Sequence, residues 1–375
     1  MTLLLVVALV RLTWRAYRTH RLLLPLSTLA GTLFFAQVLV GAFQVGRDFP
    51  PFLLALHTAT SVALLLSLGG LVVASWLLRP SPTDAPPPLD GQRARDFLTL
   101  TKPLVTALLL VTTYAGMVVG ARAWPSLSLS FWTLLGGFLA AGGSSALNQY
   151  IDRDLDTHMQ RTAKRPLAAR RMTPAEGLAF GLALSVLSFY IFAFFVNPLA
   201  AFLSLAGTVY YVVIYSLWLK KATVQNIVIG GGAGAIPPLV GWAAATGRLD
   251  VPALFLFAIV FLWTPPHFWA LALVRRKDYA RAGVPMLPVV RGEAETRRQI
   301  FLYTLELVGL TLLMPLVKLA GSVFLISALV LGAWLLHAAW RVLRRDGNRV
   351  AWKMYRYSSM YLLFLFMALV IDALV

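Results

Sequence analysis

The stretch Asn148-Gln149-Tyr150-Ile151-Asp152-Arg153-Asp154-Leu155-Asp156 follows a long apolar run and precedes a basic loop. Asn148, Asp152 and Asp156 are spaced by four residues, so they share one face if the helix of the apolar run continues through them. Asp154 points elsewhere. Two carboxylates one turn apart repel each other unless a cation lies between them, and a divalent cation with oxygen ligands is a usual way to hold a diphosphate. A solvated acidic turn at the end of a membrane helix is the alternative.

The composition around this stretch is that of a membrane protein. Of the 375 residues, 59% are hydrophobic and 13% are charged, whereas a soluble domain carries about a quarter of charged residues. Apolar runs near 20 residues recur along the chain, and each is long enough to span a bilayer. The sequence therefore predicts an all-α polytopic membrane protein. The absence of cysteine excludes disulfides and thiolate sites.

The apolar runs predict a bundle of nine helices that is preceded by two or three extra helices at the N-terminus. Residues 1–10 are too short to span and look like part of a helix. Residues 79–96 are rich in proline and predict an extended linker between an N-terminal segment, 1–78, and a main domain, 97–375. The predicted spans are 25–45, 53–78, 102–121, 129–151, 176–195, 198–217, 224–246, 251–274, 300–318, 321–341 and 355–374.

The basic residues predict how the bundle is oriented. Of the 33 Lys and Arg residues, 29 fall in one alternating set of loops and four in the other. The positive-inside rule places the first set, which includes the loops 152–175 and 275–299, in the cytoplasm of a bacterial-type cell membrane. These two large loops are expected to meet over one cavity. The net charge of +18 then reflects cytoplasmic loops and anionic lipids, and nucleic acid is not an expected partner.

Glycine and proline runs mark special helix segments. The runs 142–143 and 230–234 are rich in glycine, and small residues let membrane helices approach closely, so close packing is the favoured interpretation. Pro237-Pro238 and Pro265-Pro266 are expected to break or kink helices at membrane depth. Interrupted helices tend to line cavities rather than face lipid.

Several polar residues beyond the acidic stretch are candidates for a binding site. A short loop follows Tyr215 and carries Lys220 and Lys221, with Asn226 just beyond it. These lysines can clamp phosphate oxygens, or they can be ordinary basic residues of a cytoplasmic loop. The same two interpretations apply to the cations that follow the acidic stretch, which are Arg161, Lys164 and Arg165.

Two further polar residues stand out in the second half of the chain. Asp278 lies among four basic residues, and a local salt bridge is its simplest interpretation. His267 follows Pro265-Pro266 between Trp263 and Trp269, and an imidazole at membrane depth needs a partner. Its partner is expected to be either a bound substrate or a carbonyl that the prolines leave free.

The motifs resemble the UbiA superfamily of intramembrane prenyltransferases. The match rests on Asn148–Leu167 with its Asn-x-x-x-Asp-x-x-x-Asp pattern, and it covers about 97–375. Within the superfamily, Thr264-Pro265-Pro266-His267-Phe268-Trp269 and Pro285-Met286-Leu287-Pro288 are similar to the branch that farnesylates heme, the protoheme IX farnesyltransferases (heme O synthases). Further matches are Leu100–Pro103, Tyr215–Lys221, Gln225–Gly231 and Pro237–Trp242.

The resemblance implies an enzyme that binds farnesyl diphosphate with Mg2+ and transfers the farnesyl group to heme b. Asn148, Asp152 and Asp156 would hold the metal and the diphosphate. Asp278 matches the first position of the superfamily's second acidic motif, but Ala282 replaces the second acid. The resemblance further implies a diphosphate clamp of Lys220, Lys221, Arg161 and Arg165. His267 is the residue expected to contact heme, at the iron or at a propionate.

The first 80 residues resemble another family. Gln37–Val45 and Ala55–Ala59 are similar to the last helices of heme A synthase, which implies that His57 stands where that family places a heme-ligating histidine. The earlier helix that would carry its partner is almost wholly absent. We expect a fused remnant without heme A synthase activity, and heme A synthase as a further partner.

Two other functions fit parts of the pattern. A UbiA-type prenyltransferase with an aromatic quinone-precursor acceptor would share the acidic stretch but not the motifs around Pro265 and Pro285. A transporter or a non-catalytic heme-binding membrane protein is the alternative from another class. No inverted repeat is apparent, and the acidic residues lie at a membrane edge rather than at mid-depth, which argues against transport.

Overall fold

The computed structural model describes residues 1–46, 50–78, 81, 91–315 and 319–375, and all regular elements of these residues are helical. The elements are α1 (Thr2–Ala16), α2 (Leu23–Val45), α3 (Pro51–Leu78), α4 (Gly91–Leu100), α5 (Pro103–Ala121), α6 (Leu127–Asp156), α7 (Pro174–Phe195), α8 (Pro198–Val209), η1 (Tyr210–Leu219), α9 (Lys220–Ala222), α10 (Asn226–Thr246), α11 (Val251–Val274), α12 (Arg276–Arg281), α13 (Leu287–Val290), α14 (Gly292–Leu313), α15 (Ser322–Arg344) and α16 (Asn348–Leu374).

The predicted membrane bundle is present. Ten helices of the described chain are long and apolar enough to span a bilayer. The nine segments expected between residues 102 and 374 correspond to α5, α6, α7, α8 with η1 and α9, α10, α11, α14, α15 and α16. Of these, α14 is not among the ten, and residues 316–318 of its expected span lie outside the described residues. The N-terminal helices α1, α2 and α3 and the short α4 precede them, so the all-α polytopic fold is confirmed. Residues 91–96, which the sequence placed in an extended linker, instead form the first part of α4, while the rest of that linker lies largely outside the described residues.

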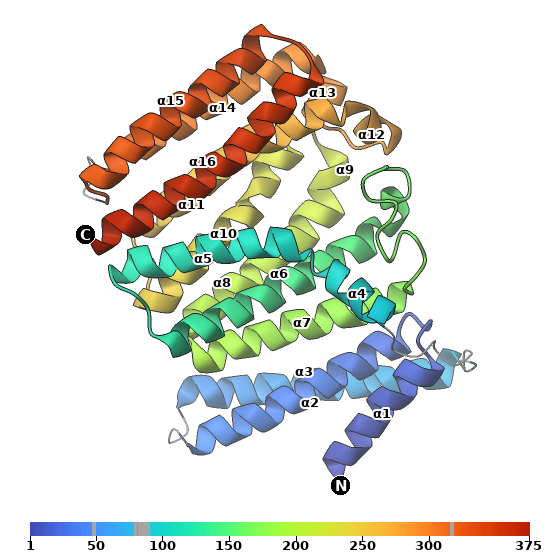
Figure 1. Ribbon diagram of the computed structural model, residues 1–375. Coiled ribbons are helices and arrows are strands. Elements are labelled where there is room, and N and C mark those ends of the chain that lie inside the picture. Colours follow the sequence, from blue (N-terminus) through green and yellow to red (C-terminus); the bar gives the residue numbers. More distant parts are fainter. Residues whose placement is uncertain (47–49, 79–80, 82–90, 316–318) are drawn as a thin grey trace.

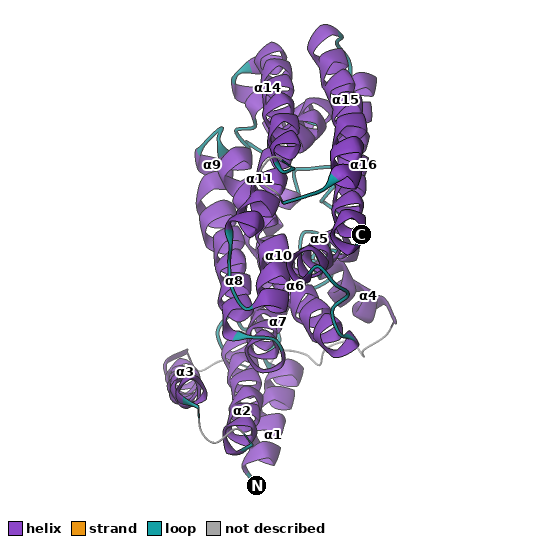
Figure 2. Cartoon of the chain, turned by 90° about the vertical axis from the view of Figure 1, so that its left-hand side faces the viewer, coloured by secondary structure: helices purple, strands orange, loops and turns teal. Residues whose placement is uncertain are grey.

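The helices of the bundle pack around α10, which contacts α5, α8 and α11, while α16 returns to contact both α11 and α5 (Figures 1 and 2). Glycines allow the closest of these contacts. A Cβ atom at Gly241 would lie 1.8 Å from the carbonyl oxygen of Thr113, so α10 and α5 meet backbone to backbone. A Cβ atom at Gly143 of α6 would likewise lie 2.9 Å from the carbonyl oxygen of Gly181 on α7. The close-packing interpretation is therefore confirmed at Gly143. In the run 230–234, Gly230 and Gly231 also pack closely, against Tyr215 and Thr264, whereas a Cβ atom at Gly234 would meet nothing within 4 Å.

The two proline pairs do not interrupt their helices. Pro237 and Pro238 lie inside α10, and Pro265 and Pro266 lie inside α11, and both helices are assigned without a break. Of the two expected effects, a break is therefore wrong, while a kink at these pairs stays a prediction. Membrane helices tolerate interior prolines because neighbouring helices and local adjustments satisfy the freed backbone groups.

The N-terminal helices pack against the outside of the bundle, at the bottom of Figure 1, where α2 contacts α7. The Thr60 hydroxyl of α3 and the Tyr190 hydroxyl of α7 are 2.6 Å apart and share a hydrogen bond. Phe43 of α2 stacks on Phe194 with ring centroids 5.0 Å apart. The contact thus combines apolar burial with a buried hydrogen bond.

One end of the bundle gathers its short elements. Figure 1 shows α9, α12 and α13 at the same end as the loop that follows α6. The side chain of Arg161 in that loop hydrogen-bonds Tyr279 of α12, and Asn226 donates to the carbonyl oxygen of Pro285 over 3.4 Å. The two large loops 152–175 and 275–299 therefore meet, as the basic-residue pattern predicts.

Candidate active site

The C-terminal turns of α6 carry the acidic face. The helix begins at a Ser126 cap and continues to Asp156 without a break. Asn148, Asp152 and Asp156 are all buried, with at most 3% of each residue exposed. The side chain of Asp154 is 87% exposed and contacts only Arg153 in the described chain. The structure therefore places the three spaced residues on one buried face and Asp154 outside it.

Asn148 connects this face to two neighbouring segments. Its Nδ2 donates to Asp152 Oδ2 over 2.7 Å and to Ser216 Oγ over 3.0 Å. Its Oδ1 accepts from the Lys102 ammonium over 3.0 Å. Since α5 starts directly after Lys102, the amide links α6 to both α5 and η1.

Both carboxylates of the face have a cationic partner. Lys220 Nζ lies 2.5 Å from Asp152 Oδ2, and Arg165 Nη1 lies 2.7 Å from Asp156 Oδ2. The second oxygen of Asp152, Oδ1, is buried and has no hydrogen-bond partner. A buried polar atom without a partner costs about 1–3 kcal/mol, so this oxygen indicates a place where a ligand binds.

The donor set suits a magnesium ion that is shared with a phosphate ligand. Mg2+ is commonly held by one or two carboxylates together with substrate phosphates rather than by a closed protein cage. Asp152 and Asp156 provide such a pair, and the described residues contain no group of three or more His, Cys, Asp or Glu side chains that would form a closed metal site. The free Oδ1 of Asp152 fits the same role.

The segment opposite the acidic face is a π-helix. Residues Tyr210–Leu219 form η1, which is long for an element that usually occurs as a single turn and often at functional sites. Ser216 Oγ donates to the carbonyl oxygen of Tyr211, five residues earlier, and Tyr211 stacks on Tyr215 with centroids 5.6 Å apart. The element ends at Lys220 and so directs that lysine toward Asp152.

The other candidate residues near η1 differ in how deeply their side chains are buried. Tyr215 packs tightly against α10, where a Cβ atom at Gly230 would lie 2.3 Å from its ring. Asn226 is buried and donates to the carbonyl oxygen of Thr223, while its Oδ1 has no hydrogen-bond partner. Lys221 is exposed, unlike Lys220, and no contact joins it to the acidic face among the described residues.

The second loop holds Asp278 in a basic environment. Asp278 is buried, and its carboxylate lies 3.5 Å from Arg281 Nη2 and 3.9 Å from Arg275 Nη1. These are the local salt bridges that the sequence suggests. Next to it, burial raises the pKa of Tyr279, whereas the hydrogen bond from Arg161 lowers it. Among the described residues, Asp278 shares no cationic partner with the α6 carboxylates.

His267 lies between α11 and α16. Its Nδ1 is 2.8 Å from Ser358 Oγ, and its ring packs against Trp263 and Tyr355 with centroids 4.2 and 4.4 Å away. Trp263 Nε1 also donates to the carbonyl oxygen of Ser358. The side-chain partner of the imidazole is thus a hydroxyl on α16 rather than a carbonyl freed by the prolines, and its contact with heme stays a prediction.

In the N-terminal helices, His57 lies beside Gln37. The Nε2 atoms of the two residues are 2.9 Å apart, and Gln37 Nε2 also donates to Ser61 Oγ over 2.6 Å. The structure gives His57 a side-chain partner within the α2–α3 pair.

Sequence reasoning missed Lys102, Ser216 and α4. Lys102 belongs to a matched motif, but its backbone adopts φ 48° and ψ 62°, directly before a proline, which the residue pattern does not reveal. Non-glycine residues rarely adopt this conformation and do so mainly at turns and functional sites. The short α4 is fixed by an ion pair of Arg93 with Glu176 and by Arg171, whose pKa is raised by its hydrogen bond to Asp96.

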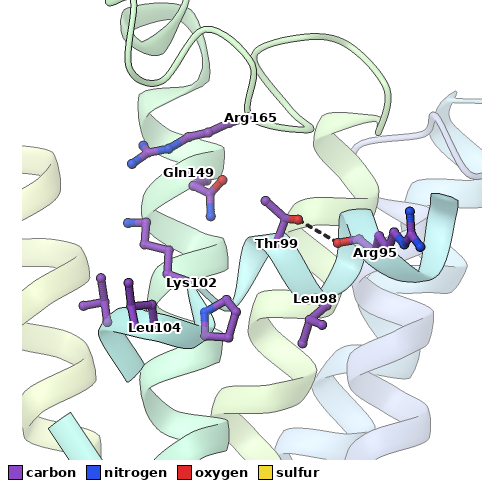
Figure 3. Close-up of a pocket in the computed structure, with 9 residues that line it drawn as sticks. Arg95, Leu98, Thr99, Lys102, Leu104, Gln149 and Arg165 are labelled. Atoms are coloured by element: carbon purple, nitrogen blue, oxygen red, sulfur yellow. Dashed lines mark hydrogen bonds between the residues drawn. The ribbon is translucent and has the colours of Figure 1, made fainter. Parts of the chain in front are cut away.

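A cavity of about 460 Å³ lies between α4, α5 and α6 (Figure 3). Lys102 and Arg165 line one part of it, and both also contact the acidic face. Figure 3 shows Gln149 between them and Arg95 at the other end. The residues that line the cavity are Arg95, Leu98, Thr99, Lys102, Pro103, Leu104, Val105, Gln149 and Arg165.

Comparisons with known proteins agree on one family. The sequence profile of the UbiA prenyltransferase family matches residues 109–369. A protoheme IX farnesyltransferase of Roseiflexus sp. (strain RS-1) is 48% identical over 99% of this chain and 73% of that protein. A protoheme IX farnesyltransferase of Symbiobacterium thermophilum is 49% identical over 75% of this chain and 95% of that protein.

Solved structures share the fold at lower identity. A digeranylgeranylglyceryl phosphate synthase structure has a TM-score of 0.64 at 17% identity and covers 76% of this chain and 99% of that chain. A UbiA homolog from Archaeoglobus fulgidus, bound to GPP and Mg2+, has a TM-score of 0.56 at 16% identity and covers 73% of this chain and 99% of that chain.

Proposed function

The chain belongs to the UbiA prenyltransferase family, and we infer that it transfers the farnesyl group of farnesyl diphosphate to a vinyl group of heme b (protoheme IX). The products are heme O and diphosphate. The observation that carries the inference is the buried α6 face, where two carboxylates lie beside Lys220 and Arg165 at the loop end of the bundle. The heme acceptor rests on relatives named protoheme IX farnesyltransferase.

The acidic face and its cations bind the diphosphate. We propose that Asn148, Asp152 and Asp156 hold Mg2+, which neutralises charge on the diphosphate leaving group when it is bound. Lys220 and Arg165 already lie against the carboxylates, so they provide positive charge at the same place. Fixed charges that match the charge developing on a leaving group lower the barrier and cost no reorganisation during reaction.

The rest of the reaction needs orientation rather than a strong base. The allylic C–O bond of farnesyl diphosphate breaks and diphosphate leaves, and the allylic carbon forms a bond to the heme vinyl group. Water adds to the resulting cation and loses a proton to the solvent, which gives the hydroxyethylfarnesyl side chain. Arg161 and Tyr279 contact each other at the loop end of the bundle, and we propose that the apolar helices accommodate the farnesyl chain. We propose His267, on the inner part of α11, as a heme contact, with Ser358 fixing its ring.

We further propose that the loop end faces the cytoplasm, because 29 of the 33 basic residues lie in that set of loops. The residues 1–78 form an N-terminal segment that packs on α7, and 97–375 form the catalytic domain. The likeness of the first 80 residues to heme A synthase, and a partnership with that enzyme, stay predictions. The Roseiflexus relative that matches 99% of this chain has the name protoheme IX farnesyltransferase.

An extract assay tests the function. Membranes that contain the protein are incubated with heme b, farnesyl diphosphate and Mg2+, and the extracted hemes are analysed by mass. We expect heme O to accumulate and to disappear when farnesyl diphosphate is omitted. A parallel reaction offers an aromatic quinone precursor as the acceptor. Prenylation of that precursor without conversion of heme b would overturn the proposed acceptor.

A further inference from the structure

The cavity between α4, α5 and α6 differs from the acidic face that it adjoins. None of Asp152, Asp156 or Lys220 lines it. Its wall instead combines cations with the apolar residues Leu98, Leu104 and Val105, each at least half exposed. A cavity with an apolar side and basic ends suits a ligand that has both a large apolar body and anionic groups.

Polar atoms at the cavity remain available for an occupant. Gln149 is 1% exposed, and its Nε2 donates to the carbonyl oxygen of Leu100, but its Oε1 is buried without a partner. Arg95 is exposed, and its guanidinium has no ion pair within the described residues. These groups differ from Lys102 and Arg165, which already contact Asn148 and Asp156.

Arg95 belongs to α4, and ion pairs on the side of α4 that faces away from the cavity hold this helix in place. Asp96 accepts hydrogen bonds from Arg171 Nε and Nη2, and Arg93 pairs with Glu176. Arg95, Leu98, Thr99 and Lys102 follow the spacing of one helix face, with Lys102 just past the end of the helix, and all four line the cavity. These contacts hold the helix in place, whereas the exposed Arg95 side chain lies at the far end of the cavity and extends away from Lys102 (Figure 3).

The distance along this face matches the acceptor. Lys102 is seven positions after Arg95. The five positions from Arg95 to Leu100, where α4 ends, rise by about 7.5 Å along the helix, and Lys102 lies just beyond that end. A porphyrin of the heme b type carries its vinyl groups and its propionates on different sides of the ring, at a separation of similar size. Carboxylates at the Arg95 end would leave the vinyl edge beside Lys102, which is one side chain away from Asn148.

We propose that this cavity is the acceptor site, and that Arg95 binds the propionate carboxylates of heme b. This placement is an alternative to a heme contact at His267, because His267 does not line the cavity. The ring edge then lies along Leu98, Pro103 and Leu104, and Lys102 and Arg165 separate it from the diphosphate. The proposal rests on the proposed function, because it takes heme b as the acceptor. Exposed ion pairs are modest in energy, so Arg95 contributes to acceptor affinity and orientation rather than to the chemical step.

The test compares heme b with its dimethyl ester, in which both propionates are neutral. Binding is measured by absorbance titration of the protein in neutral-lipid nanodiscs, without farnesyl diphosphate or Mg2+, and KM is measured in parallel. We expect wild type to favour heme b about fivefold, and Arg95→Gln to lose this preference while its KM for farnesyl diphosphate and its kcat with saturating heme b stay unchanged. Arg95→Lys should keep part of the preference. Lys353→Gln, which removes an exposed cation elsewhere, is the matched control.

An equal preference for heme b in wild type and Arg95→Gln would overturn the acceptor site. Arg95→Gln could instead weaken binding only when anionic phospholipid is present, and equally for heme b and its ester. That result would assign Arg95 to a lipid headgroup and would also overturn the acceptor site. Failure of wild type to make heme O would overturn the proposed function instead, and it is scored separately from the binding titration.

Discussion

The two loops that meet over the site both contain a buried aspartate, but the two carboxylates have different surroundings. Asp152 has one oxygen against Lys220 and Asn148, and the other buried oxygen has no partner. Asp278 lies between Arg275, the residue before α12, and Arg281, the last residue of α12. Both carboxylates have cationic neighbours, but of the two only Asp152 has a buried oxygen without a hydrogen-bond partner, and that oxygen is available for a cation.

The difference between the two aspartates indicates which part of the bundle binds the diphosphate and its metal. Ala282 replaces the second acid in the later loop, and the cations Lys220 and Arg165 lie on the α6 face instead. We infer that the α6 face provides the principal metal site, and that the α12 region contributes mainly positive charge and the Arg161–Tyr279 contact.

The largest effect is expected at Asp152. Asp152→Asn keeps the size of the side chain but removes the charge, and loss of a principal metal ligand should raise the barrier by several kcal/mol. The turnover number should fall by about a thousandfold or more, because each factor of ten corresponds to about 1.4 kcal/mol. Steady-state heme O formation measures this. Asp154→Asn is the matched control and should stay within about twofold of wild type, since that side chain is exposed. Equal losses at both positions would contradict the comparison.

Lys220 and Lys221 offer a second comparison, between a lysine beside the acidic face and its exposed neighbour. Lys220→Met removes the ammonium beside Asp152, and we expect kcat to fall by about a hundredfold, the scale for the loss of one charge-stabilising group. Lys221→Met, one residue further and exposed, should change kcat by less than about threefold. Thermal stability in detergent is measured for both variants. If Lys221→Met proved the more damaging at unchanged stability, the assignment of Lys220 would be wrong.

A smaller effect is expected in the second loop. Asp278→Asn should raise the Mg2+ concentration needed for half-maximal activity by a few-fold, because its carboxylate still lowers the local positive potential between two arginines. The rate at saturating Mg2+ should fall by less than about tenfold. Activity is titrated against Mg2+ in both proteins. An unchanged midpoint with a collapsed maximal rate would place Asp278 in the chemical step.

The sequence predicts most of the fold because each membrane helix is an apolar run of the necessary length. The predicted helix boundaries are less accurate where the first turns of a helix are rich in charged residues. The span expected at 300–318 is α14, which begins at Gly292, because its first turns are charged and are held by local pairs such as Arg297 with Glu293 and Arg298 with Glu295. The linker ends earlier than expected for a similar reason, since α4 depends on its contacts with Arg171 and Glu176.

At the site, spacing alone places Asn148, Asp152 and Asp156 on one face, because α6 is a regular helix. The partners of this face could not be predicted, because they come from other helices. The π-helical segment η1 places Ser216 beside Asn148. The left-handed backbone of Lys102, just before α5, places the Lys102 ammonium beside the same amide. Neither conformation has a clear signal in the residue pattern.

The central claim is that the α6 face, and not the α12 loop, binds the metal and the diphosphate. Calorimetric binding of the unreactive analogue farnesyl thiodiphosphate, with and without Mg2+, tests it on wild type, Asp152→Asn and Asp278→Asn. We expect Mg2+ to tighten binding strongly in wild type, to tighten it nearly as strongly in Asp278→Asn, and to have almost no effect in Asp152→Asn. A Mg2+ effect that persists in Asp152→Asn and is lost in Asp278→Asn would contradict the claim.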